Sequence, residues 1–231
     1  LSIGSFDGVH RGHQTLIKTL ADQAHLAGSL AVVITFFPHP LEVLRNLKDN
    51  FYLTSPEKRA QLLCSLGVDR IITVEFTREI AEMSADEFVQ ELKDHLGMTH
   101  LLVGPDFSLA KNRQGNITWL AGQQTRYQFK LEVVQPTLAG DEKISSSQIR
   151  QLIIKGDVGE AASLSGRYYE IEGPVVEGDK RGRTLGFPTA NLQVWAKQLL
   201  PLSGVYATLI HLEGKAYPSV TNIGIRPTFR P

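Results

Sequence analysis

The stretch GSFDGVHRGH, residues 4–13, decides how the beginning of this chain folds. It follows the apolar residues Leu1–Ile3 and leads into a helical pattern that opens near Gln14. An apolar stub, a glycine-rich turn and a helical pattern in this order predict a strand-to-helix turn at the start of an α/β unit.

The composition of this turn favours an anionic ligand. Its three glycines, Gly4, Gly8 and Gly12, let the backbone approach a ligand closely or turn with positive φ. A helix that starts just after them presents unpaired N–H groups and the positive end of its dipole. His10 and His13 are three residues apart, so they share one face if the first helical turn includes them. The stretch therefore predicts a phosphate clamp in a nucleotide site.

Two other interpretations of the histidine pair stay open. The histidines fit a zinc site only if further ligands join them, because zinc takes about three or four protein ligands. The single cysteine, Cys64, lies in an apolar helical pattern that is typical of a core residue. The other alternative is an ordinary glycine-rich turn with two surface histidines.

Composition limits the classes of partner. The 231 residues carry no net charge, and 42% are hydrophobic and 21% charged, as in a globular protein. We therefore expect neither a nucleic-acid partner nor a membrane partner, since no bulk basic surface and no long apolar run is present. One cysteine excludes an internal disulfide. The chain starts without Met on what resembles the end of a strand, so we expect preceding residues to be missing. We expect a cytoplasmic location.

The first 150 residues alternate between strand and helix patterns. Strands are predicted at 30–37, 70–74, 100–103 and 129–134, and helices at 14–27, 56–66, 85–96 and 116–124. This alternation predicts a parallel sheet with right-handed crossovers, in which ligands lie at the carboxyl ends of strands. The opening turn, the loop Phe37–Pro40 and the loop Gly104–Asn116 should lie along that edge. The last of these is either a functional loop or a solvated insertion.

The heptapeptide ISSSQIR, residues 144–150, is a second candidate phosphate site. Ser145 or Ser146 can cap a helix that runs to Lys155 and is ended by Gly156. Arg150 lies one turn into this helix and can bind phosphate oxygens bidentately. A plain capped helix remains the alternative.

The pattern changes near residue 164. Strand-like stretches at 169–178, 204–212 and 217–223 are separated by Gly/Pro-rich loops and not by helices, which predicts a small antiparallel barrel or sandwich. A boundary near 157–166 divides the chain into domains 1–160 and 161–231.

Four motifs in this order, GSFDGVHRGH, GPDF, ISSSQIR and GRTLGFPTAN, resemble the bacterial bifunctional riboflavin kinase/FAD synthetase family over essentially the whole chain. The resemblance implies a Rossmann-like nucleotidylyltransferase domain with a parallel sheet, followed by a riboflavin kinase-like antiparallel β-barrel. It implies two activities: transfer of AMP from ATP to FMN, giving FAD and pyrophosphate, and phosphorylation of riboflavin to FMN with ATP.

The resemblance also implies roles for residues of the first domain. His10, His13 and Arg150 would be catalytic and would bind the ATP phosphates. The remaining ATP-binding residues would be Gly4, Phe6, Asp7, Gly12, Ser146 and Ser147, and the flavin-binding residues Pro38, Asp106 and Phe107.

In the second domain, the resemblance implies a kinase site with ATP, riboflavin and Mg²⁺. The glycine-rich run would wrap the phosphates with Gly178, Lys180, Gly182 and Gly186. Thr189 and Asn191 would reach the magnesium ion, because oxygen ligands suit this hard cation. The alternative for this PTAN stretch is a proline turn with a capping threonine.

Two features depart from the family pattern. Leu109-Ala110 stands where the family usually has a phenylalanine-glycine pair, and alanine adopts glycine-only dihedral angles at a cost, so flavin affinity is expected to differ. The kinase base of the family, a glutamate, falls after Pro231, so we expect an incomplete barrel. Two further functions stay open: a flavin or nucleotide binding module without turnover, and an adenylyltransferase for another phosphate acceptor.

Overall fold

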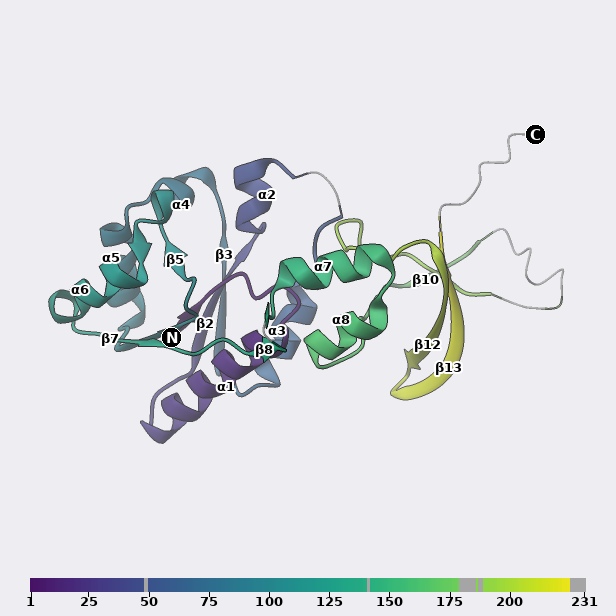
Figure 1. Cartoon of the computed structure of the whole chain (residues 1–231), viewed down its shortest axis with the longest axis horizontal. Coiled ribbons are helices and arrows are strands. Elements are labelled where there is room, and N and C mark those ends of the chain that lie inside the picture. Colours follow the sequence, from purple (N-terminus) through teal and green to yellow (C-terminus); the bar gives the residue numbers. More distant parts are fainter. Residues whose placement is uncertain (48–49, 141, 179–185, 187–188, 225–231) are drawn as a thin grey trace. The chain divides into compact units, whose positions relative to one another are not determined.

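The structure is a computed structural model that describes residues 1–47, 50–140, 142–178, 186 and 189–224 (Figure 1). The chain divides into two units, and each is described by itself. The first unit contains residues 1–49 and 54–145, and the second contains residues 50–53 and 146–231.

A parallel sheet forms the centre of the first unit. Strands β1 (Ser2–Ile3), β2 (Val32–Phe37) and β3 (Arg70–Glu75) pair in parallel, as do β4 (His100–Val103) and β7 (Lys130–Val133). Leu1 joins the two groups, since its nitrogen donates to His100 O at 3.0 Å and its carbonyl accepts from Leu102 N at 2.9 Å. The resulting order is β3-β2-β1-β4-β7, and the predicted parallel α/β sheet is confirmed.

Helices follow the strands, with bounds that differ from those predicted. They are α1 (Arg11–Leu26), α2 (Pro40–Arg45), α3 (Pro56–Cys64), α4 (Arg78–Glu82), α5 (Ala85–Leu96) and α6 (Ile117–Tyr127). The prediction that the first helix opens near Gln14 is wrong by three residues, because His10 serves as the N-cap. The short helices α2 and α4 are not predicted, since neither is long enough to show a clear apolar period. Ser84 and Glu87 form a capping box at the start of α5.

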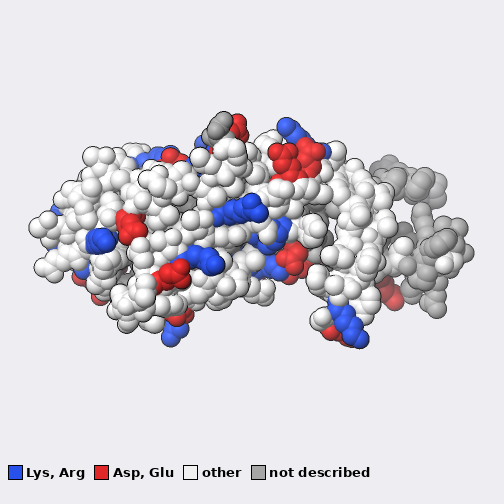
Figure 2. Space-filling model, turned by 60° about the horizontal axis from the view of Figure 1, so that its bottom comes forward, with Lys and Arg blue, Asp and Glu red and all other residues white. Residues whose placement is uncertain are grey.

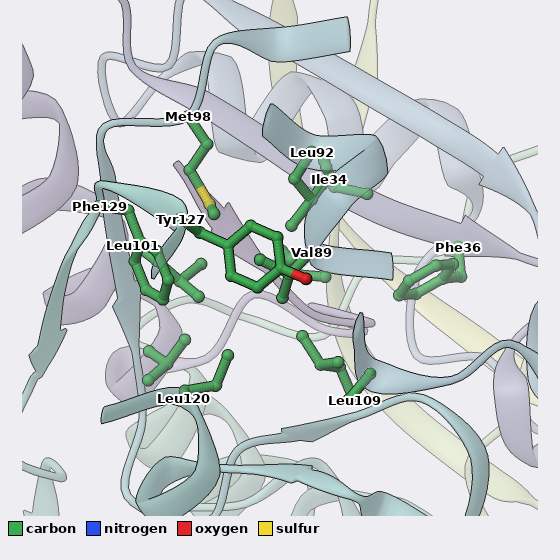
Figure 3. Close-up of a cluster of buried hydrophobic side chains, with 13 residues drawn as sticks. Ile34, Phe36, Val89, Leu92, Met98, Leu101, Leu109, Leu120, Tyr127 and Phe129 are labelled. Atoms are coloured by element: carbon green, nitrogen blue, oxygen red, sulfur yellow. The ribbon is translucent and has the colours of Figure 1, made fainter. Parts of the chain in front are cut away.

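Alternation along the strands gives the sheet an apolar surface on both sides. Ile34 of β2 and Leu101 of β4 belong to one buried cluster, which includes residues of α5 and α6 (Figure 3). Val33 and Leu102, one position away on the same strands, belong to a second cluster with α1 and α3. Successive side chains of a strand point to opposite faces, so these four residues place a helical layer on each side of the sheet.

Two small hairpins extend the loops of the first unit. The loop after β4 contains β5 (Ser108–Leu109), the short helix η1 (Lys111–Arg113) and β6 (Gly115–Asn116), with β5 and β6 antiparallel. Strands β8 (Leu138–Ala139) and β9 (Glu142–Lys143) form the other hairpin. The loop at residues 104–116 therefore has regular backbone structure, and its functional role stays a prediction.

The second unit combines two helices with short antiparallel strands. Its elements are α7 (Ser146–Lys155), α8 (Val158–Ser165), β10 (Val175–Val176), β11 (Asn191–Leu192), β12 (Gly204–Leu212) and β13 (Lys215–Ile223). Strand β10 pairs with β11 and β12 with β13, and in the described part of the chain these strands do not close into a barrel. The predicted helix to Lys155 and the strand 204–212 are confirmed. The domain boundary predicted at residue 160 stays a prediction.

The distribution of surface charge and the length of the helices bear on which partners the protein can bind. Figure 2 shows Lys and Arg interspersed with Asp and Glu over the face that it draws. None of the helices within the described ranges has the length and apolar character needed to cross a bilayer.

Candidate functional site

The loops that carry three of the predicted motifs leave neighbouring strands at the same edge of the sheet. The opening loop follows β1, the loop Phe37–Pro40 follows β2, and the loop that starts at Gly104 follows β4. Chain order reverses between β1 and β4, because β2 and β3 lie on one side of β1 and β7 lies beyond β4. Ligands of open parallel sheets bind at the carboxyl edge at such a switch point.

The two histidines of the opening motif lie together at the start of α1. Their rings are stacked, with centroids 3.7 Å apart and planes inclined by 20°. His10 is the N-cap and only 5% exposed, and its Nδ1 accepts a long hydrogen bond of 3.4 Å from His13 N. An accepting Nδ1 puts the proton of a neutral imidazole on Nε2, and binding of a ligand by His10 stays a prediction.

The surroundings of the pair explain the glycines and the phenylalanine of the motif. The ring of Phe6 packs edge-on against His13, with centroids 5.2 Å apart. A Cβ on Gly4 would lie 3.0 Å from the Phe6 ring, and one on Gly12 would lie 3.2 Å from the His10 imidazole. A larger residue would crowd the Phe6 ring at position 4 and the His10 ring at position 12, so Gly12 leaves room for the stacked histidines and Gly4 for the phenylalanine beside them.

Two residues predicted to bind ATP have buried side chains. Phe6 is 3% exposed and belongs to the cluster under α1, and Asp7 is 1% exposed and bonded to Thr54. In the described part of the chain, no group of three or more His, Cys, Asp or Glu forms a metal site with the histidines.

The residues predicted to bind flavin follow β2 and β4. Pro38 is half-buried directly after β2, Phe107 packs partly buried against the core, and Asp106 is exposed. The carboxylate of Asp106 forms an ion pair with Lys143, a residue that the sequence analysis missed. Its only signal was its position directly before ISSSQIR. The ion pair brings the end of β9 to the loop after β4.

The predicted phosphate residues Ser146, Ser147 and Arg150 belong to the second unit, in the first turns of α7. Arg150 is 8% exposed, and its guanidinium carbon lies 3.8 Å from the centroid of the Phe51 ring. Its Nε donates to Phe51 O at 2.9 Å. Phe51 thus fixes the direction of this side chain, and a role of Arg150 beside the histidines stays a prediction.

The predicted kinase residues are described only in part. Gly178 lies two residues after β10, Gly186 has a positive φ of 83°, and Thr189 is exposed. Asn191 is the first residue of β11, opposite Val176 of β10. Lys180 and Gly182 lie outside the described residues.

The departure at Leu109-Ala110 has a visible structural consequence. Leu109 is 7% exposed and lies so close to Gly115 that a Cβ there would meet Leu109 Cδ1 at 2.3 Å. Ala110 has φ 67° and ψ 179°, a conformation that glycine adopts and other residues avoid. The next residue, Lys111, is held at both its backbone and its side chain. Its backbone nitrogen donates to Met83 O, and its side chain forms an ion pair with Glu82. The hydrogen bond to Glu82 raises the pKa of Lys111.

Replacing Ala110 by glycine should therefore stabilise the first unit by about 1 kcal/mol. The strain of a non-glycine residue here costs about 1–3 kcal/mol, which exceeds the roughly 0.5–1 kcal/mol that glycine adds to the entropy of the unfolded chain. Urea denaturation measures the difference. Ala121→Gly, at an exposed position of α6, is the control and should destabilise by about 1 kcal/mol. Destabilisation by both variants would contradict the assignment of strain to Ala110.

Comparison with known proteins supports the family resemblance in both halves of the chain. A family model described as FAD synthetase matches residues 1–148, and one described as riboflavin kinase matches residues 165–231. The bifunctional riboflavin kinase/FMN adenylyltransferase of Listeria monocytogenes serovar 1/2a is 39% identical and aligns with 100% of this chain and 73% of its own length. The enzyme of the same name from Escherichia coli K12 is 38% identical and aligns with 99% of this chain and 73% of its own length.

A solved structure has the same fold over nearly the whole chain. The crystal structure titled as a macrolide-efflux protein from Streptococcus pneumoniae superposes with a TM-score of 0.88 at 29% sequence identity. The match covers 99% of this chain and 75% of that one. The order of elements described above is therefore shared with a relative whose structure is known.

Proposed function

The chain belongs to the bifunctional riboflavin kinase/FMN adenylyltransferase family, and from this membership we propose which of its residues carry out the two reactions. As an FMN adenylyltransferase it transfers AMP from ATP to FMN, which gives FAD and pyrophosphate. As a riboflavin kinase it phosphorylates riboflavin to FMN. The single observation that carries the assignment of the first site is the stacked histidine pair at the start of α1.

In the proposed adenylyl transfer, a phosphate oxygen of FMN attacks the α-phosphorus of ATP. The new P–O bond forms as the bond between the α-phosphorus and its bridging oxygen breaks, and pyrophosphate leaves with the electron pair. His10 and His13 donate hydrogen bonds to the phosphate oxygens on which negative charge grows. Such donors act without a covalent intermediate, because fixed donors at a helix N-terminus need little reorganisation during the reaction.

We assign the remaining contacts by resemblance to the family. Ser146, Ser147 and Arg150 bind phosphate oxygens of ATP, and the contact of Arg150 with Phe51 supports a preset direction for its guanidinium. Asp106, Phe107 and Pro38 border the flavin. The positions of these three residues after β2 and β4 support this assignment, because the loops of both strands leave the carboxyl edge.

We assign the residues of the kinase half by resemblance to the family as well. Thr189 and Asn191 would hold Mg²⁺, and their hydroxyl and amide oxygens fit the preference of this ion for oxygen ligands. In the kinase reaction the ion would neutralise part of the negative charge on the ATP phosphates, and in adenylyl transfer it would reduce the repulsion between the two anionic reactants, ATP and FMN. We propose that β10–β13 belong to a riboflavin kinase-like barrel and that Gly178 and Gly186 border the phosphates. The exposed thiol of Cys64 accords with a cytoplasmic location, where thiols stay reduced.

Incubation of the chain with ATP, Mg²⁺ and FMN tests the proposal. FAD and pyrophosphate should form in equal amounts, as measured by flavin chromatography and a coupled pyrophosphate assay. Nicotinamide mononucleotide and pantetheine phosphate, offered in place of FMN, should give no adenylylated product.

Each other outcome points to one of the alternatives. Binding of FMN and ATP without pyrophosphate release would favour a binding module. Product with one of the other acceptors at a rate equal to that with FMN would favour an adenylyltransferase of different specificity.

A further inference from the structure

Buried polar contacts connect the opening loop to Thr54, two residues before α3. The carboxylate Oδ1 of Asp7 accepts from Thr54 N at 3.1 Å and from Thr54 Oγ1 at 3.2 Å. The same hydroxyl oxygen accepts from Gly8 N at 3.1 Å. Thr54 is 6% exposed, and it lies 46 and 47 positions from the two residues that it contacts. One hydroxyl therefore bridges two consecutive residues of the loop that precedes His10.

A buried arginine of α3 supports the same loop two residues earlier, at Ser5. Arg59 is 1% exposed, and its Nη1 donates to Ser5 O at 2.9 Å while its Nη2 donates to Phe36 O at 3.1 Å. Ser5 O also accepts from Thr35 Oγ1 at 3.1 Å. The guanidinium thus ties the start of the opening loop to the end of β2, and the loop leaves the sheet from a fixed point.

The loop needs such support because its backbone conformation is unfavourable. Phe6 has φ 47° and Val9 has φ 36°, and a β-branched residue at positive φ is a genuine outlier. Val9 N donates to Phe6 O at 3.1 Å, which closes the turn immediately before His10. Strained conformations of this kind persist only where surrounding contacts over-determine them, and they concentrate at functional sites.

We infer that Thr54 is a positioning residue for adenylyl transfer, which holds the strained turn so that His10 and His13 stack at the start of α1. The inference rests on the proposed role of the histidines. Thr54 acts through the loop, and its contacts to Asp7 and Gly8 carry the effect. Because a displacement of a catalytic group by about 1 Å can cost a hundredfold in rate, a small relaxation of this turn should be visible in kcat.

The matched variants Thr54→Val and Thr54→Ser test the inference. Valine keeps the shape and removes the hydroxyl, so kcat for FAD formation should fall about 10- to 100-fold while the KM for ATP changes roughly twofold or less. Serine keeps the hydroxyl and should stay within about threefold of the original kcat. Equal kcat values for the two variants would overturn the inference.

Ser55→Ala controls for loss of stability. Ser55 caps α3 through a 3.1 Å bond from Lys58 N, so its removal weakens the same helix without touching the opening loop. We expect this variant to keep its kcat. If Ser55→Ala lowers kcat as far as Thr54→Val does, general weakening of α3 explains both results and the inference fails.

The double variant Thr54→Val/His13→Ala separates this inference from the proposed function. If Thr54 acts through the histidines, the kcat of the double variant should be less than about twofold below that of His13→Ala alone. A full additional loss would overturn the positioning role. Should His13→Ala alone leave kcat unchanged, the proposed function fails, whatever the Thr54 variants do.

Discussion

Replacing His13 by alanine should lower the kcat of FAD formation about 100- to 1000-fold, the loss that follows removal of one preorganised donor to a developing oxyanion. The dissociation constant of ATP should rise less than about tenfold, because a bound ground-state triphosphate still has other contacts. Steady-state kinetics of pyrophosphate release and equilibrium titration with ATP measure the two quantities. The amount by which the loss in kcat exceeds the loss in ATP affinity measures the part of the interaction that His13 makes only in the transition state.

His13 is a cleaner target than His10. The Nδ1 of His10 caps α1, so His10→Ala would remove a proposed phosphate donor and also a helix cap, at a cost of about 1 kcal/mol. His25→Ala, near the exposed end of the same helix, is the matched control and should leave kcat unchanged. Equal losses in kcat and ATP affinity for His13→Ala would contradict a transition-state role.

Local patterns in the sequence were enough to predict the architecture of the first unit. The β-branched run in residues 30–37 indicates a strand covered on both faces, and β2 packs against both buried clusters. The serine and glutamate of Ser84–Glu87 indicate a helix start, because both groups act on residues three positions apart. Signals of this range need only neighbouring residues, so they can be recognised without knowing the fold.

The start of α1 shows where local rules fail. The apolar pattern predicts a helix that opens near Gln14, and since histidine is not among the preferred N-cap residues, no capping signal marks an earlier start. In the structure His10 caps it, and Arg11 and Gly12 belong to the first turn. The error concerns the residues that we propose to be catalytic, and departures from local rules are expected where a sequence also has to serve a function.

The support of the opening loop could not be predicted, because its contacts join distant parts of the chain. Arg59 stands in the polar sequence PEKRAQ, which suggests a solvated helix face, and yet it is buried against carbonyl groups 23 and 54 positions away. Thr54 resembles an ordinary residue before a helix start. Only the packing of α3 against the sheet gives these two side chains their role.

The packing of α1 gives the second large effect. Ile17 lies four residues after His13, on the same face of the helix, and is fully buried in the cluster that α1 forms with α3 and the sheet. Ile17→Ala should destabilise the first unit by about 2–4 kcal/mol, because the lost transfer free energy adds to the cost of the cavity. Ile17→Val should cost only about 0.5–1.5 kcal/mol. Urea denaturation followed by circular dichroism measures both.

Lys18→Ala, at the exposed neighbouring position, should change stability by less than about 0.5 kcal/mol. If Ile17→Ala cost no more than Lys18→Ala, α1 would not be held by this cluster, and the cluster could not fix the helix start. Because the two histidines lie at that start, their stacking depends on α1 staying packed on the sheet. A large cost for Ile17→Ala would therefore mean that the apolar side of α1 stabilises the helix whose first turn carries the proposed catalytic pair.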